Sequence, residues 1–526
     1  MTTSSGYLDA RLENGRGIRT GIVLPSAPVI ATGGFALALA VAFLALPPSG
    51  TDLSAAMARA DFARTAPFAP VDFRWYSGTQ QFGYSLLAQY PMALLGPRTV
   101  GAISAVIASV SFAVVLRRTA VPRPVLGSLA GAACIFANLV SGRITYSLGI
   151  AIGLSTFASV VRGRRRMPLA LAALTSATSP VAGLFVGVGA VSMLRPGHLR
   201  TGVGIGLGAA VPLVVTGLVF GQGGTNTMSW ADTYHPLLLC LAVAAVVPHR
   251  TVRIAALLTA AGLVAAYLVP GPVGLAAARF PIMFAVPIVL ACARVRSIWA
   301  VCIAAAMIVW QSPLAVGDWR ARGDITSSSG YFQPLLAELG RRSVDGRVEV
   351  PPLRNYWDAV YLARSYPMAR GWLRQLDTSR NAIFFDGELT ASSYREWLDK
   401  NAVQYVAVAS AEPSWVGRKE AQLVTSGLPY LSQVWTNEQW RLYAVADHVP
   451  VVEAPAEVLG QRPERITFAV PTGGEYNVRV GYSRWLTLEG PGCLRRAEDG
   501  TVLVEARRPG PFGLLSDLDP RSHERC

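Results

Sequence analysis

Long apolar runs fill residues 27–310, and they limit the possible fold more than any other feature of the chain. A helix needs about 20 predominantly apolar residues to cross the hydrocarbon core of a bilayer. Several runs reach that length, and others are shortened by flanking glycine and proline. The runs that we expect to cross the membrane are Ala27–Leu46, Val100–Leu116, Val125–Val140, Ile144–Val161, Thr201–Phe220, Pro236–Val247, Ile254–Val269, Phe280–Ala293 and Ser297–Trp310. The sequence therefore predicts an α-helical polytopic membrane domain.

The loops between these runs alternate in charge. One set is basic and contains no acid, which is typical of loops on the cytoplasmic side of a membrane. The basic residues of this set are Arg117, Arg118, Arg123, Arg162, Arg164, Arg165, Arg166, Arg195, Arg200, Arg250, Arg253, Arg294 and Arg296. We therefore expect the alternate loops to lie outside, together with everything after Gln311. The longest of them, residues 48–98, is named the first long loop below.

One segment, Met167–Leu194, has two interpretations because basic residues flank it on both sides. A single kinked span would place one basic cluster outside. Two half-helices that turn back at Pro180 would keep both clusters inside, and broken helices of this kind occur where the backbone lines a polar cavity. With the hairpin, the N-terminus is cytoplasmic and the C-terminal half is extracytoplasmic.

The chain divides into regions of different composition. Residues 1–26 are polar and glycine-rich, which predicts a disordered cytoplasmic tail, and residues 27–313 form the membrane domain. Helix-type periodicity at Pro334–Arg342 and Ser392–Lys400, with alternating runs at Val403–Ala409 and Trp440–Val445, predicts an extracytoplasmic α/β domain over residues 314–448. Strand patterns between Gly/Pro turns predict a small extracytoplasmic β domain over residues 449–526; they fall at Arg465–Val470, Tyr476–Tyr482 and Thr501–Ala506.

The net charge of +15 would suggest nucleic-acid binding in a soluble protein. Here the basic residues sit in short loops between apolar runs, so we expect a membrane lipid partner and no nucleic acid. The six cysteines show no metal-ligand spacing, and we expect no metal site. Cys493 and Cys526 form a disulfide in one interpretation, if their domain is outside the cell. The other interpretation, two free thiols, is the one that we favour.

Acidic residues are nearly absent from the membrane region. Between Ala27 and Gly317 the acids are Asp52, Asp61, Asp72 and Asp232, and all four fall in loops that we place outside. A proton-coupled transporter would need acids within its spans. Asp52, Asp61 and Asp72 share the first long loop, where one of them is a candidate general base for a membrane-surface enzyme. The alternative is that they are solvated loop charges.

Further candidate binding residues lie in the loops of the same face. Arg74, Trp75 and Tyr84 belong to aromatic stretches of the first long loop, which either roof a cleft for a sugar or lipid headgroup or anchor the loop at the membrane interface. Arg143 and Arg279 stand alone at the ends of spans, where a guanidinium suits a lipid phosphate, or where it extends to the interface. The remaining candidates are Asp232 and His235, which flank Tyr234.

Parts of the C-terminal half resemble actinobacterial membrane proteins that are described as related to 6-pyruvoyl-tetrahydropterin synthase. The stretches that carry this resemblance are Asn355–Leu362, Ala369–Asp377, Tyr394–Tyr405, Trp435–Tyr443 and Tyr476–Ser483. No pterin-synthase zinc motif accompanies them.

The overall layout is similar to that of GT-C glycosyltransferases. This resemblance implies many spans, a long first outer loop with a catalytic acid, and a C-terminal domain outside the membrane. It also implies a polyprenyl-phosphate sugar as donor and a glycan or glycolipid of the cell envelope as acceptor. Asp52 follows the first span most closely and is the best match for the catalytic acid. The sequence departs from the family in having no adjacent pair of acids.

Two hypotheses follow. In the first, the protein is a GT-C-like transferase in which an aspartate of the first long loop deprotonates an acceptor hydroxyl and Arg279 stabilises the phosphate leaving group. In the second, it is a non-catalytic transporter or assembly protein for envelope glycans. The sequence assigns no cofactor in either case.

Overall fold

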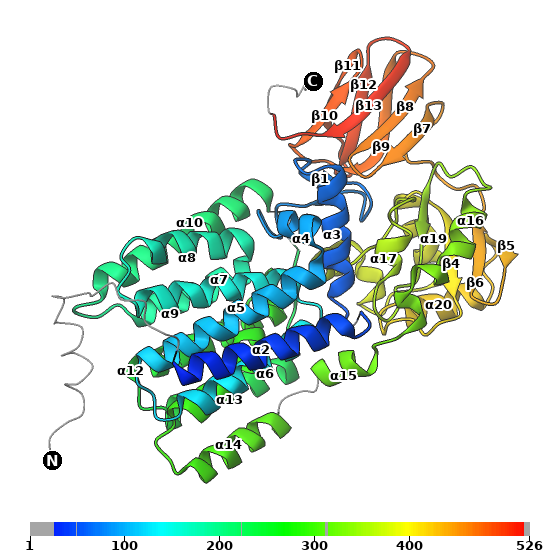
Figure 1. The fold of residues 1–526 in the computed structure, drawn as a ribbon. Helices are drawn as coiled ribbons and strands as arrows, with labels where there is room; N and C mark the ends of the chain where they lie inside the picture. The colour runs from blue at the N-terminus through cyan, green and yellow to red at the C-terminus, as the bar shows by residue number, and fades with distance from the viewer. Residues whose placement is uncertain (1–25, 49, 222–223, 311–313, 520–525) are drawn as a thin grey trace, which may run out of the picture.

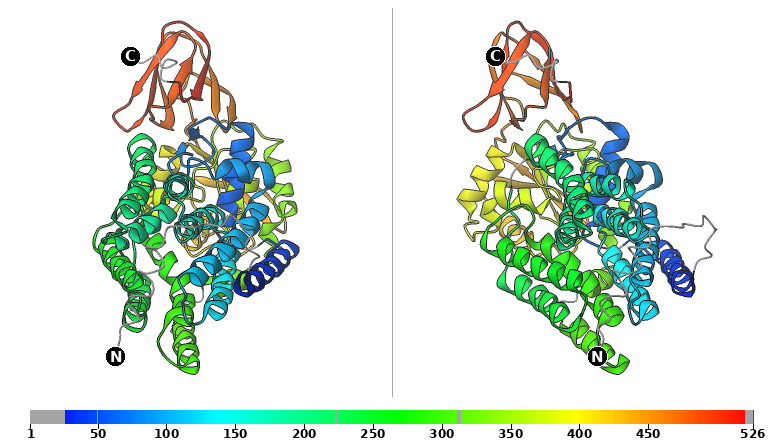
Figure 2. Two further views of the ribbon diagram at one scale, coloured as in Figure 1. Left: turned by 60° about the vertical axis from the view of Figure 1, so that its left-hand side comes forward. Right: turned by 90° about the vertical axis from the view of Figure 1, so that its left-hand side faces the viewer.

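The computed structural model describes residues 26–48, 50–221, 224–310, 314–519 and 526. It shows a bundle of apolar helices, an α/β domain against one end of that bundle, and a β domain that projects beside the first long loop (Figure 1). The same arrangement is visible from two further directions (Figure 2). The predicted fold class is confirmed. The predicted disordered tail falls almost wholly outside the described residues.

The helical bundle follows the predicted apolar runs closely. Its helices are α2 (Ala27–Ala45), α5 (Pro97–Arg118), α6 (Pro124–Val140), α7 (Ile144–Val160), α8 (Met167–Thr178), α9 (Pro180–Ser192), α10 (Leu199–Phe220), α11 (Trp230–Val246), α12 (Arg250–Leu268), α13 (Arg279–Cys292) and α14 (Ser297–Trp310), with the 3₁₀ turn η1 (Gly274–Ala278) before α13. Within the described residues, five helical segments are long and apolar enough to cross a membrane: α2, α5, α10, α12 and η1 with α13. The protein is a multi-pass membrane protein.

Helices α8 and α9 form a hairpin. Ser179 is extended between them and precedes Pro180, whose ring disfavours a helical conformation at the residue before it. The start of α8 and the end of α9 both pack on the first half of α10. The carbonyl of Leu169 in α8 lies against Gly208, where a Cβ would meet it, and the carbonyl of Ala190 in α9 lies against Gly202 in the same way. The hairpin interpretation is confirmed, and the single kinked span is wrong.

The first long loop is folded rather than extended. It contains α3 (Leu53–Thr65), the two-residue strands β1 (Val71–Asp72) and β2 (Thr79–Gln80), and α4 (Gln89–Leu95). Its Ser85 Oγ donates a hydrogen bond to Thr178 O at 2.7 Å, and Leu86 N donates one to Ala177 O at 2.9 Å. The tip of the α8–α9 hairpin is therefore held against this loop.

The α/β domain contains a four-stranded sheet in the order β3-β4-β6-β5. The strands are β3 (Arg347–Glu349), β4 (Val403–Ala409), β5 (Leu431–Thr436) and β6 (Trp440–Val445), and β3 pairs with β4 in parallel while the other pairs are antiparallel. The continuous apolar pattern of β4 suits a central strand that is buried on both faces. The helices are α15 (Leu314–Arg320), α16 (Gln333–Leu339), α17 (Asp358–Tyr361), α18 (Arg374–Arg380), α19 (Ala391–Lys400) and α20 (Arg418–Thr425), with 3₁₀ turns η2 (Ile325–Ser327), η3 (Ser329–Tyr331) and η4 (Ala382–Phe384).

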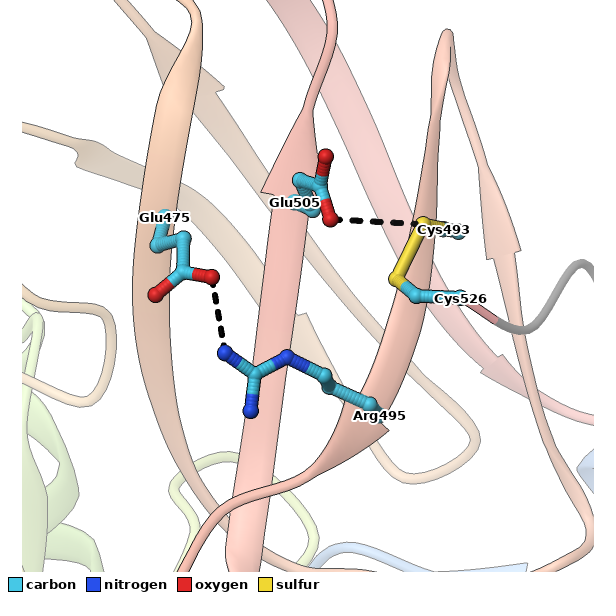
Figure 3. Close-up of a disulfide and its surroundings, with 5 residues drawn as sticks. All are labelled: Glu475, Cys493, Arg495, Glu505 and Cys526. Atoms are coloured by element: carbon cyan, nitrogen blue, oxygen red, sulfur yellow. Dashed lines mark hydrogen bonds and ion pairs between the residues drawn. A yellow bond between two sulfur atoms is a disulfide. The ribbon is translucent and has the colours of Figure 1, made fainter.

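The β domain consists of two antiparallel sheets, β10-β13-β8-β7 and β11-β12-β9. Its strands are β7 (Glu457–Arg462), β8 (Arg465–Val470), β9 (Gly474–Gly481), β10 (Leu486–Glu489), β11 (Gly492–Arg496), β12 (Thr501–Ala506) and β13 (Gly510–Ser516). Alternate side chains of β8, β9 and β12 point into a common apolar core. Figure 3 shows Cys493 joined to Cys526 by a disulfide, so the expectation of two free thiols is wrong.

A buried ionic cluster forms the centre of the α/β domain. Arg370 is 1% exposed and donates to both oxygens of Asp377, at 2.9 and 2.8 Å, and to Glu420 at 2.9 Å. Glu349 lies 3.9 Å from the same guanidinium. One cation faces three carboxyl groups here. Burial, and then the neighbouring carboxylate of Glu420, raise the pKa of Glu349, and burial raises the pKa of Glu420 to about 7.

Rising pH is expected to reduce the stability of this domain. The folded state retains a proton on Glu420 up to about pH 7, whereas the unfolded chain releases it near the ordinary value of 4.5. The contribution of this group is therefore fully present below about pH 4.5 and is lost as the pH rises to about 7. Thermal unfolding midpoints of the full-length protein across this range measure the effect.

Glu420→Gln should flatten this pH dependence, because the amide cannot titrate and keeps an oxygen for Arg370. Glu396→Gln is the matched control, since Glu396 lies exposed on the neighbouring α19. If the parent, Glu420→Gln and Glu396→Gln lose stability equally as the pH rises, then Glu420 is not the titrating group.

The first long loop docks into both C-terminal domains. The Trp75 ring is 3% exposed, and its Nε1 donates to Ala359 O at 3.1 Å. Tyr76 Oη donates to Gly371 O at 2.5 Å, and Met368 N donates to Arg74 O at 2.8 Å. On the other side, Phe73 N donates to Pro463 O at 2.7 Å in the β domain. The loop therefore joins all three parts of the molecule.

Gly371→Ala is expected to loosen this docking, because a Cβ at residue 371 would overlap the indole ring of Trp75. Overpacking of a buried contact costs about 1–3 kcal/mol, so the thermal midpoint of the full-length protein should fall. Gly330→Ala is the control, since a Cβ there makes only an ordinary contact with Ser328. Equal midpoints for the two variants would contradict this role of the Trp75 contact.

Candidate functional site

Asp52 lies between two arginines that come from distant turns of the chain. Its Oδ2 is 3.2 Å from Nε of Arg143, which precedes α7, and 3.7 Å from Nη2 of Arg279, which begins α13. All three side chains are partly exposed, at 28%, 19% and 21% respectively. A carboxylate and two guanidinium groups therefore share one solvent-accessible site.

Two glycines bring the turns of this site together. Gly50 and Gly142 both have positive φ, of 95° and 78°, a conformation that glycine adopts without strain. A Cβ on Gly50 would overlap the backbone of Ser141, and one on Gly142 would overlap that of Leu53. This close approach lets Asp52 N donate to Ser141 O at 3.2 Å, which places Asp52 beside Arg143.

A second carboxylate, Asp318 of α15, belongs to the same site. It interacts with the Ser141 hydroxyl and the Thr51 backbone, and it lies close to Arg143 and Asp52. Burial raises its pKa. Asp318 was not among the predicted site residues, because it lies beyond the apolar region of residues 27–310 in which acids are rare. The signal that could have found it is that Asp318 is the first acid after the last apolar run. Two acids that are far apart in sequence thus form a pair in space.

Aromatic side chains and a third arginine complete the site. Tyr84 interacts with Arg279, and the guanidinium carbon of Arg59 lies 3.6 Å from the centroid of the Tyr84 ring. Arg279 also lies over Tyr146, at 5.6 Å. Burial lowers the pKa of Arg59, which is on α3. The sequence analysis did not select Arg59 or Tyr146, although it did select Asp52, Tyr84 and Arg279.

The site continues into a small pocket in the first long loop. Arg59 and Tyr84 line this pocket together with Asp72, Trp75 and Gln80. The Asp72 carboxylate is engaged by Arg74, whose Nε lies 3.0 and 3.1 Å from its two oxygens and whose Nη2 lies 2.7 Å from Oδ2.

The Arg74 guanidinium also donates to Ala58 O on α3 at 2.8 Å. Asp72 and Arg74 therefore form a buried structural pair, with side chains only 9% and 4% exposed.

The other sequence-selected residues lie in structural contacts. Asp61 bridges α3 to the α/β domain, with its Oδ2 at 2.8 Å from Nε of Arg364 and its Oδ1 at 2.8 Å from Nη1 of Arg64. Asp232 caps the N-terminus of α11 through Ser229, and His235 Nδ1 lies 3.0 Å from Ala231 O on the same helix.

One group of potential metal ligands was found among the described residues, and it consists of Cys493, Glu505 and Cys526. Both sulfurs of this group belong to the disulfide in Figure 3, and Glu505 lies 3.9 Å from Cys493 Sγ. The group is therefore part of the disulfide's surroundings.

No protein-family model matches this chain, and no curated protein matches it. Solved structures are similar to it at low sequence identity. Arabinofuranosyltransferase AftD from Mycobacteria matches at 15% identity with a TM-score of 0.43 over 85% of this chain, and a mutant form at 16% with a TM-score of 0.46. The chain spans 41% of the length of the AftD chain.

ArnT from Cupriavidus metallidurans, bound to undecaprenyl phosphate, matches at 12% identity with a TM-score of 0.43. That alignment covers 79% of this chain and 97% of the ArnT chain. Similarity at this level defines no activity for the present chain, so its function is argued from the site.

Proposed function

We propose that this protein is a GT-C-like membrane glycosyltransferase that moves a sugar from a polyprenyl-phosphate carrier to a glycan or glycolipid acceptor of the cell envelope. The observation that supports this proposal is the placement of Asp52 between Arg143 and Arg279. A carboxylate that can accept a proton and cations that can bind a phosphate then stand within one site.

The donor phosphate binds to the arginines in this mechanism. Guanidinium groups match phosphate oxygens through charge and paired hydrogen bonds. Asp52 contacts two arginines, and its contact with Arg279 is the longer one, at 3.7 Å. The incoming phosphate therefore displaces the Asp52 carboxylate from Arg279 before it reaches Arg143. Arg279 and Arg143 then stabilise the charge that develops on the leaving phosphate.

Asp52 acts as the general base once its arginine partners hold the donor. It takes the proton of an acceptor hydroxyl, the hydroxyl oxygen forms a bond to the anomeric carbon, and the bond from that carbon to the phosphate oxygen breaks. Asp318 shares Arg143 with Asp52, so it keeps this arginine oriented when Asp52 turns to the acceptor.

Exposed apolar side chains of the first long loop suit the lipid part of the donor. Leu94 and Leu95 of α4 are 82% and 51% exposed, and Phe68 is 70% exposed. Helix α4 packs against α3, which carries Arg59. Apolar surface of this kind is stable beside acyl chains rather than in water. The polyprenyl chain would therefore lie along α4 while its phosphate reaches the arginines.

We propose that the site and both C-terminal domains lie outside the cytoplasm. The disulfide in the β domain supports this side, because such bonds persist in oxidising compartments. Alkaline phosphatase fused after Ser516 should be active in cells, and the same enzyme fused after Gly163 should be inactive, since Arg162–Arg166 is expected in the cytoplasm. Activity of the fusion after Gly163 and inactivity of the fusion after Ser516 would contradict this orientation. That result would also exclude an acceptor on the outer side of the membrane.

Asp52→Asn is expected to abolish transfer without unfolding the protein. Loss of a general base lowers the rate by ~10²–10⁴-fold, whereas the ion pairs that Asp52 makes are partly exposed, and such pairs contribute about 0–1 kcal/mol each to stability. Turnover is measured on purified protein with a panel of polyprenyl-phosphate sugars, including undecaprenyl-phosphate forms, and thermal unfolding is measured on the same samples.

Asp72→Asn and Asp61→Asn are the matched controls from the same loop. Asp72→Asn breaks a buried ion pair, which costs about 3–5 kcal/mol, so its main effect should be on the thermal midpoint. Asp61→Asn loses two ion pairs, with Arg64 and Arg364, whose side chains are 45% and 44% exposed, and such pairs contribute about 0–1 kcal/mol each. Normal turnover by Asp52→Asn would refute the mechanism. Donor binding by the parent without any transfer would favour a non-catalytic transporter or assembly protein.

A further inference from the structure

A second pocket lies where the first long loop, the C-terminal end of α10 and the β domain meet. Val219 lines it on the side of α10, and the polar side chains of its lining belong to Gln80, Arg380, Tyr482, Ser483, Arg484 and Trp485. Its volume is about 260 Å³. One water needs only ~10–15 Å³ on this measure, so the pocket has room for a ligand much larger than a water.

Two buried polar atoms on residues that line this pocket have no hydrogen-bond partner. They are Oε1 of Gln80, which accepts, and Nε1 of Trp485, which donates. The amide of Gln80 is held in place because its Nε2 donates to Ser483 Oγ at 2.6 Å. A buried polar group without a partner destabilises the fold by about 1–3 kcal/mol. A ligand that both donates and accepts hydrogen bonds would satisfy both atoms, and a sugar hydroxyl does this.

The remaining lining also suits a saccharide. Arg380 Nη1 donates to Tyr76 O at 2.6 Å and to Gly78 O at 3.0 Å, which fixes the side chain at the edge of the pocket. Its lining includes no carboxylate among the described residues, so a cationic ligand would find no counter-ion. The Trp485 ring is stacked on Phe220 of α10, with centroids 5.2 Å apart, which gives the pocket a rigid apolar wall.

This pocket is connected to the proposed transfer site. Gln80 lines both this pocket and the smaller pocket that contains Arg59 and Tyr84. Tyr84 in turn interacts with Arg279 beside Asp52. Polar residues therefore follow one another from the carboxylate of Asp52 to the edge of the β domain.

We propose that the pocket formed by Gln80, Arg380, Ser483 and Trp485 binds a sugar unit of the glycan acceptor and so orients the chain whose end reaches Asp52. The role of the bound sugar as acceptor rests on the proposed function. Binding of a saccharide to this pocket does not, because it requires no turnover.

Binding of a defined array of neutral and uronate-containing oligosaccharides to the full-length purified protein tests the proposal. We expect the parent to bind at least one saccharide class and Trp485→Phe to bind it about fivefold more weakly, because phenylalanine keeps the stacking on Phe220 but lacks the N–H. Gln80→Ala should also weaken binding.

Trp372→Phe is the matched control. Trp372 is also a stacked tryptophan with a buried Nε1 that has no partner, but its ring packs on Tyr356, and it does not line the pocket. This variant should bind like the parent.

Three results would overturn the proposal. The first is that the parent binds no saccharide, and the second is that Trp485→Phe and Trp372→Phe weaken binding equally. The third is that a low concentration of inorganic phosphate displaces the saccharide, which would indicate an anion site. Asp52→Asn should bind saccharide like the parent. If Asp52→Asn also transfers sugar at the parent rate, the transferase mechanism fails while the binding result stands.

Discussion

The packing of Trp75 against Gly371 is the contact on which the arrangement of the three domains depends. Only glycine leaves room there for the indole ring, and the ring is anchored by its hydrogen bond to Ala359. The preceding pair of Asp72 and Arg74 holds the loop backbone in the shape that this insertion requires. Because Phe73 and Ser77 of the same loop also hydrogen-bond to the β domain, one short segment fixes both C-terminal domains relative to the helices.

The first long loop also builds the candidate site. It carries Tyr84, which interacts with Arg279 of the helical bundle, and Arg59 of α3, which lies over the Tyr84 ring. The tip of the α8–α9 hairpin contacts the loop through the hydrogen bond from Ser85 to Thr178 O. Three arginines then face two carboxylates, Asp52 and Asp318. An excess of cations over fixed anions suits the phosphate group that we propose for this site, and the partly exposed contacts of Asp52 suit the base that we propose there.

Much of the helical architecture was predictable from the sequence. The apolar runs predicted α2, α6 and α7 to within a residue or so at each end, because lipid-type burial leaves a continuous hydrophobic pattern along the chain. Strand patterns likewise predicted β4, β6 and β8; β8 has one buried face, with side chains that point to opposite sides, whereas β4 is buried on both faces. The hairpin at Pro180 remained one of two interpretations, because flanking charge alone does not show where a broken helix goes.

The candidate site was only partly determined by the sequence. Charge and position selected Asp52, Arg143 and Arg279, since isolated charges beside apolar runs are conspicuous. Only the resemblance to GT-C enzymes, through position after the first span, favoured Asp52 over Asp61 and Asp72, because the partners of these residues were unknown. The tertiary structure gives the three aspartates different surroundings: Arg364 contacts Asp61, Arg74 contacts Asp72, and Asp318 lies close to Asp52. Side-chain ionic contacts depend on distances in space between residues up to about 300 positions apart, and hydrophobic periodicity carries no information about them.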